Sequence, residues 1–180
     1  MKFLKKLVAT VLLISTTVAV AEASEDYALT DEYKLLTDMK MAKDQQAKIV
    51  EMNRVLEHKN IDLQKVKQSI NSFDKVVHGL INGDNNLKLN GTTIPHIRQQ
   101  LDSLLIAWNR SKSLLSQDLN RLSYKQKALN SLNTLLLEMT QTVERYNQSY
   151  SRYKQRSRLS SIVNRHMRTT NRTFAFNTIY

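Results

Sequence analysis

Residues that break helices are confined to one short window of this sequence. The three glycines and the single proline are Gly79, Gly83, Gly91 and Pro95. Glycine and proline are the residues that most disfavour a helix interior, so the chain on either side of the window can form long helices. A β-sandwich or a glycine-rich phosphate loop needs more turn residues than this composition offers. The sequence therefore predicts an all-α protein.

Apolar residues outside this window recur at steps of three and four. They trace four coiled-coil-like stripes, along residues 35–56, 63–80, 94–122 and 129–146. This spacing places apolar side chains on one face of a helix. A single helix over residues 26–82 would be about 85 Å long and would leave its apolar face in water. We therefore expect an up-down-up-down four-helix bundle over residues 24–158, with Trp108 as a core anchor.

The turns of this bundle are expected between successive stripes. Residues 58–60 offer the first turn, with Asn60 capping the helix that follows. The glycine window forms the second turn. After it, Thr92 or Thr93 can cap a helix that has Pro95 in its first turn, where a missing N–H has no partner to lose. Length alone places the third turn between the last two stripes, near residues 116–123.

The first 23 residues have the parts of a secretory signal peptide. Lys2, Lys5 and Lys6 precede an apolar run over residues 7–20, and alanines with A-x-A spacing follow. This is the pattern of a cleaved signal, and the run is shorter than the ~20 apolar residues of a spanning helix. We expect residues 1–23 to be removed and the product to be periplasmic or secreted. An uncleaved anchor is the alternative.

The net charge of +11 is concentrated in a basic tail. Residues 24–144 carry 16 Lys/Arg against 15 Asp/Glu, whereas residues 145–180 carry eight Lys/Arg and no carboxylate. Arginine among tyrosines suits phosphate-bearing partners such as lipid headgroups, lipopolysaccharide or nucleic acid. The candidate polyanion-binding residues are Arg152, Lys154, Arg156, Arg158, Arg165 and Arg168. The alternative is a solvated, partly disordered tail over residues 159–180.

Catalytic and metal-binding patterns are not found. The sequence has no cysteine, and its four histidines are scattered, at His58, His78, His96 and His166. Asp74 lies four residues before His78, but two ligands do not make a metal site. The nucleophile-elbow, zinc-metalloprotease and P-loop motifs do not occur. We expect a binding protein that is not an enzyme and needs no metal or cofactor.

Two stretches match the pattern of a known family. Residues 69–84 read SINSFDKVVHGLINGD, and residues 133–146 read NTLLLEMTQTVERY. Together with the residues leading to Trp108, these stretches resemble the N-terminal domain of type IV pili methyl-accepting chemotaxis transducers, the PilJ-type domain. That family is related to the periplasmic domains of NarX-type nitrate/nitrite sensors. The resemblance covers roughly residues 33–150.

The resemblance implies a sensory role. In the nitrate-sensing relatives, basic residues on the opening helix hold the anion, and Lys34 lies near one such position. Lys34 is therefore the candidate ligand-binding residue. The transmembrane helix and signalling module that follow this domain in transducers do not occur in this sequence. We expect a sensor-like protein that binds a small ligand or a signalling partner in pilus, chemosensory or nitrate/nitrite-type signalling.

The expected partners follow from the same comparison. A membrane chemoreceptor or sensor protein is one, and a second copy of the chain is another, because the relatives work in dimeric receptors. The alternative is a structural or interaction protein that uses the basic tail to bind envelope or extracellular polyanions. In that case the anionic envelope surface, and not nucleic acid, is the expected partner, and binding should weaken steeply with salt.

Overall fold

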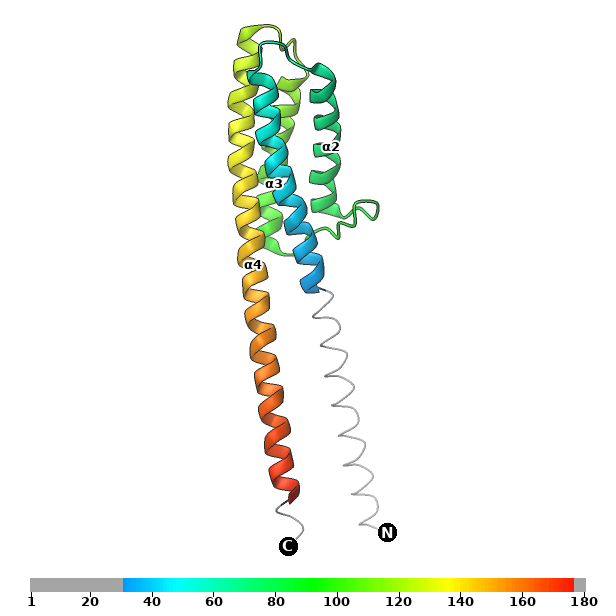
Figure 1. Ribbon diagram of the computed structural model, residues 1–180, viewed down its shortest axis with the longest axis vertical. Coiled ribbons are helices and arrows are strands. Elements are labelled where there is room, and N and C mark those ends of the chain that lie inside the picture. The colour runs from blue at the N-terminus through cyan, green and yellow to red at the C-terminus, as the bar shows by residue number, and fades with distance from the viewer. Residues whose placement is uncertain (1–30, 177–180) are drawn as a thin grey trace. The chain divides into compact units, whose positions relative to one another are not determined.

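The computed structural model describes residues 31–176, with side chains as far as Met167. Within these residues the chain forms four helices and no strand (Figure 1). Residues 31–57 are helical, and they are followed by α2 (Leu63–Asn82), α3 (Pro95–Leu115) and α4 (Leu122–Phe176). The all-α prediction is confirmed for this part of the chain. The signal peptide expected at residues 1–23 lies outside the described residues.

The first turn lies where it was expected, but its capping residue differs. Residues 58–60 bend the chain, and α2 begins after Asp62, whose carboxylate accepts a hydrogen bond of 3.0 Å from the Lys65 amide. The predicted cap, Asn60, is thus two residues too early. Both residues are good caps by type. Asp62 also brings a negative charge to the positive end of the helix dipole, which favours the later start.

The second and third turns agree more closely with the prediction. Pro95 occupies the first turn of α3, as expected, while Ile94 holds the cap position and provides no side-chain hydrogen bond. Thr92 lies two residues before this cap, and its hydroxyl accepts a hydrogen bond of 3.2 Å from the Ile94 amide. The third turn lies between Leu115 and Leu122, inside the region predicted from length.

The last helix continues past the expected boundary at residue 158. α4 has 55 residues, which corresponds to roughly 80 Å. The tail expected to be partly disordered over residues 159–180 is helical as far as Phe176. The chain has no glycine or proline after Pro95, and its arginines and lysines are good helix formers, so no local signal ends the helix. The chain divides into two compact units along α4: Lys34–Arg152 forms one, and the other includes α4 from Tyr153 onward.

One hydrophobic core joins the four helices of the unit Lys34–Arg152. Trp108, Tyr146 and Phe73 are its largest fully buried side chains. The rings of Phe73 and Trp108 lie with centroids 4.5 Å apart and planes inclined by 44°. Such tilted aromatic pairs add to the burial energy of the two side chains. The predicted role of Trp108 as a core anchor is confirmed.

Hydrogen bonds between the helices show their relative directions. Gln46 bonds to Thr140 at 2.8 Å, and Asn53, seven residues later, bonds to Asn133, seven residues earlier. Helix 31–57 and α4 therefore run antiparallel. Pairs of hydrogen bonds show the same antiparallel order between helix 31–57 and α2, between α2 and α3, and between α3 and α4. Short connections between consecutive helices permit this arrangement.

The loop between α2 and α3 folds back on itself. Gly91 has a φ of +67° and lies so close to the end of α2 that a Cβ there would be 2.6 Å from the Gly83 nitrogen. Asp84 and Leu89 exchange backbone hydrogen bonds of 2.9 Å within the loop. Leu89 is 2% exposed, so the loop covers one end of the apolar core.

Candidate functional site

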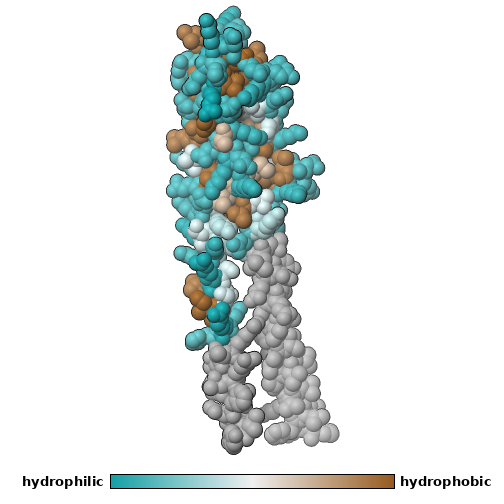
Figure 2. All heavy atoms as spheres, in the orientation of Figure 1, coloured by the Kyte–Doolittle hydropathy of each residue, from teal (hydrophilic) through white to brown (hydrophobic). Residues whose placement is uncertain are grey.

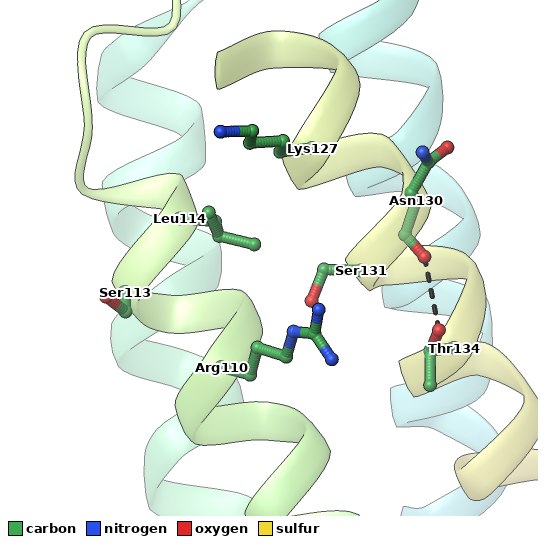
Figure 3. Close-up of a pocket in the computed structure, with 7 residues that line it drawn as sticks. All are labelled: Arg110, Ser113, Leu114, Lys127, Asn130, Ser131 and Thr134. Atoms are coloured by element: carbon green, nitrogen blue, oxygen red, sulfur yellow. Dashed lines mark hydrogen bonds between the residues drawn. The ribbon is translucent and has the colours of Figure 1, made fainter. Parts of the chain in front are cut away.

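A groove of about 560 Å³ lies between α3 and α4 (Figure 3). It belongs to the compact unit Lys34–Arg152. Its lining residues come from both helices: Arg110, Ser113 and Leu114 from α3, and Lys127, Asn130, Ser131 and Thr134 from α4. On each helix these positions are separated by steps of three and four, so they share one face. The two faces meet because α3 and α4 run antiparallel.

Ser131, which lines the groove, contacts a second serine, Ser111, inside the core. Ser111 is fully buried and Ser131 is 7% exposed, and their hydroxyl oxygens are 2.8 Å apart. The Ser111 hydroxyl also lies 3.0 Å from the Ala107 carbonyl oxygen. The hydrogen bonds of these buried hydroxyls are thus satisfied inside the protein.

The groove has an uncompensated positive charge. Arg110 and Lys127 line it, and no carboxylate does. Figure 3 shows the Arg110 guanidinium extending across the groove toward α4. Lys112, on the neighbouring face of α3, is by contrast neutralised by Asp74 at 2.8 Å. Among the described residues neither Arg110 nor Lys127 has an acidic partner.

Weaker contacts hold the other α4 residues that line the groove. The Lys127 ammonium lies 5.9 Å from the centre of the Tyr124 ring, a cation–π contact. The Thr134 hydroxyl donates to the Asn130 carbonyl at 3.3 Å, and the Asn130 side-chain oxygen accepts from Gln126 at 3.2 Å. Figure 3 shows the side-chain amide of Asn130 pointing away from Arg110. The groove therefore offers an anion two cations, one from each helix.

A second group of polar side chains lies inside the core, near the loop between α2 and α3. Asp38 is 3% exposed and accepts a hydrogen bond of 3.3 Å from the Asn90 amide. Burial raises the pKa of Asp38 to about 6, although the Asn90 hydrogen bond opposes this rise. The fully buried Tyr146 hydroxyl has no hydrogen-bond partner among the described residues. Burial and then the Asp38 charge raise the pKa of Tyr146.

The structure does not bring the residues predicted from the sequence into the groove. Lys34 is exposed on helix 31–57 and does not line the groove. The tail residues Arg152, Lys154, Arg156, Arg158 and Arg165 are exposed along α4. The side chain of Arg168 lies beyond those described. Among the described residues no group of three or more His, Asp or Glu side chains is placed to hold a metal ion.

Sequence reasoning did not single out Arg110 or Lys127, although a signal was present. Neither residue has Asp or Glu three or four positions away on its helix. Arg98, on the same helix as Arg110, does have such a neighbour, with Asp102 at 3.6 Å. A cation without a local carboxylate is available to an external anion.

The fold and the groove define a helical-bundle protein with a basic surface site. Comparisons with protein-family models, with curated proteins and with solved structures find no match. Within the described residues no helix is both long and apolar enough to cross a membrane.

Proposed function

We propose that this protein is a non-catalytic, sensor-like helical bundle that binds a small anionic ligand in the groove between α3 and α4. The observation that carries the proposal is the pair of cations, Arg110 and Lys127, in a groove lined by no carboxylate. The planar guanidinium can hold two oxygens of a carboxylate, nitrate or phosphate at once. Lys127 supplies a second charge from the opposite helix.

The remaining lining residues suit recognition better than turnover. Ser113, Asn130 and Thr134 present hydroxyl and amide groups, which can hydrogen-bond to the polar atoms of a ligand. None of the lining residues is a histidine or a carboxylate that could act as a general base. Binding without covalent chemistry is therefore the role that we assign to the groove.

The sequence resemblance to PilJ-type and NarX-type sensor domains supports a sensory role. On this proposal the protein works in the periplasm or outside the cell and presents its ligand to a membrane chemoreceptor or sensor protein. A ligand that bridges α3 and α4 would favour one packing of these two helices, and a partner could recognise that packing. The site then lies on α3 and α4 and not at Lys34.

Thermal unfolding of the purified protein tests the proposal. Nitrate, nitrite, phosphate and small carboxylates are added separately at constant ionic strength. A ligand at 100 times its Kd stabilises the folded state by about 2.7 kcal/mol, which raises Tm by several degrees. We expect Arg110→Gln to abolish the rise in Tm. Arg110→Lys should keep only part of it, because lysine keeps the charge but lacks the planar guanidinium that holds two oxygens at once.

Lys40→Gln is the matched control, because Lys40 is an exposed helical cation outside the groove. This variant should keep the full rise in Tm. The proposal is wrong if no anion shifts the Tm of the unaltered protein, or if Arg110→Gln responds as strongly as Lys40→Gln.

A further inference from the structure

The C-terminal stretch of α4 exposes several apolar side chains. Leu159, Ile162, Val163 and Met167 are 62%, 60%, 50% and 62% exposed. We call these four residues the α4 apolar stripe. In Figure 2 one of the brown, hydrophobic patches lies on this stretch of α4 among hydrophilic surface. Four exposed apolar residues so close together on one helix indicate a surface that binds a partner.

The stripe and three of the four cations of this stretch occupy different faces. At 100° per residue, the four apolar residues fall within an arc of about 140°. Lys154, Arg158 and Arg165 fall outside this arc, and Arg156 lies among the stripe residues, one turn before Leu159. Long arginine side chains can lie along an apolar surface while their charged ends reach water or a phosphate. The stretch is therefore a basic amphipathic helix.

We propose that this helix lies on the surface of a bilayer that contains anionic phospholipids, with the α4 apolar stripe inserted among the acyl chains. The sequence has no acidic residue after Glu144, so nothing in this stretch repels an anionic surface. Apolar insertion and attraction between arginines and phosphates act together in helices of this kind. The helix would lie along the membrane and not cross it.

The combination of stripe and charge favours lipid over two other partners. A second copy of the helix could cover the stripe, but it would bring the same cations and no carboxylates to pair with them. Nucleic acid would pair with the arginines but would leave the apolar stripe in water. Of these three partners, an anionic bilayer is the one that offers both a negative surface and an apolar interior. The inference is independent of the ligand bound in the groove.

Vesicle cosedimentation of the purified protein tests the inference. The vesicles contain either phosphatidylcholine alone or phosphatidylcholine with 30% phosphatidylglycerol. We expect binding to the mixed vesicles at 50 mM NaCl, little binding to the neutral ones, and a steep loss at 500 mM NaCl. The double variant L159Q/I162Q should bind about tenfold more weakly or worse, because two apolar anchors are lost. The double variant R156Q/R158Q should lose roughly 25-fold, because each surface cation contributes about fivefold.

Matched controls use residues of the same types on the unit Lys34–Arg152. Ile106 and Leu137 are 73% and 57% exposed, so I106Q/L137Q removes two exposed apolar side chains away from the stripe. K40Q/K43Q removes two exposed charges from helix 31–57. Both controls should bind the mixed vesicles within about twofold of the unaltered protein. Circular dichroism of every variant confirms that its helix content is unchanged.

Several outcomes would overturn the inference. The first is no binding to mixed vesicles at 50 mM NaCl, and the second is equal loss in L159Q/I162Q and I106Q/L137Q. Binding to single-stranded DNA or lipopolysaccharide as tight as to the vesicles, and insensitive to L159Q/I162Q, would show a general polyanion site instead. Sedimentation that shows a dimer dissociated by L159Q/I162Q, without vesicle binding, would assign the stripe to a second copy.

Discussion

The indole N–H of Trp108 on α3 donates a hydrogen bond of 2.8 Å to the Asp74 carboxylate on α2. Lys112, one turn further along α3, donates to the same oxygen at 2.8 Å. Burial acts to raise the pKa of Asp74, but the hydrogen bonds from Lys112 and Trp108 outweigh burial and hold this pKa below its ordinary value. One carboxylate thus links two helices and satisfies the polar atom of the largest core side chain.

Replacing Asp74 by alanine should destabilise the fold. The variant leaves the indole N–H of the fully buried Trp108 without its acceptor, which costs about 2 kcal/mol of unfolding free energy. Urea denaturation at pH 7 measures the change. Asp102→Ala is the control, because Asp102 forms only an exposed ion pair with Arg98 at 3.6 Å, and its loss should cost less than about 0.5 kcal/mol. Equal losses in the two variants would contradict the structural role of Asp74.

Asp38 should make stability depend on pH in the opposite sense to an ordinary ion-paired carboxylate. Burial raises its pKa from an ordinary 3.8 to about 6. Its contribution to stability is therefore fully present below pH 3.8 and is lost as pH rises through about 6. The loss amounts to roughly 3 kcal/mol, because at neutral pH folding must bury a carboxylate that is already charged in the unfolded chain.

Asp38→Asn isolates this contribution, because asparagine keeps the shape and cannot ionise. Relative to the unaltered protein, the variant should gain up to about 3 kcal/mol of unfolding free energy between pH 4 and pH 8. Denaturation in urea at four pH values in this range follows the difference. Asp102→Asn, an exposed counterpart, should show no such trend. A constant difference across the range for Asp38→Asn would mean that the pKa of Asp38 is the same in the folded and unfolded states.

Tyr146→Phe should be neutral or stabilising. The hydroxyl of Tyr146 is fully buried and has no hydrogen-bond partner in the part of the chain that the structure describes, so its removal ends a desolvation cost without breaking a bond. We expect a gain of about 0 to 2 kcal/mol by thermal or urea unfolding. Tyr124→Phe, at a partly exposed position on the same helix, should change stability by less than about 0.5 kcal/mol. A loss above 1 kcal/mol in Tyr146→Phe would show that the hydroxyl forms a stabilising bond in solution.

Gly91→Ala should be one of the more damaging substitutions in the loop. The φ of +67° disfavours any residue with a Cβ, and that Cβ would lie 2.6 Å from the Gly83 nitrogen and 2.8 Å from the Asn82 carbonyl carbon. These neighbours are backbone atoms, so the loop itself must shift. We expect a loss of roughly 2–4 kcal/mol in unfolding free energy by urea denaturation.

Lys88→Gly is the informative comparison for the loop. Lys88 has a left-handed φ of 56° without being glycine, so glycine relieves strain there while adding freedom to the unfolded chain. The two effects should leave stability within about 1 kcal/mol of the unaltered protein. If Gly91→Ala is as mild as Lys88→Gly, the close approach of Gly91 to the end of α2 does not persist in solution.

The helices and turns could be predicted because their signals are local. The breakers between Gly79 and Pro95 and the three- and four-residue spacing of apolar positions act within a few residues of chain. Local signals gave the wrong helix cap where two nearby residues are both good caps, as Asn60 and Asp62 are. They also failed where the sequence offers no stop, as in α4 beyond residue 158. The resemblance to sensor domains and the signal peptide stay predictions.

The amino-acid sequence by itself determined an all-helical chain, the positions of its turns and the face that each helix buries, because periodicity decides which side chains leave water. Only the tertiary structure decided which faces meet. Arg110 and Lys127 form one groove because α3 and α4 pack antiparallel in a particular register. Asp38, a carboxylate beside the apolar positions Leu35 and Met39, is buried because neighbouring helices and a loop cover it. Register and coverage depend on contacts between residues far apart in the chain, and no local pattern records them.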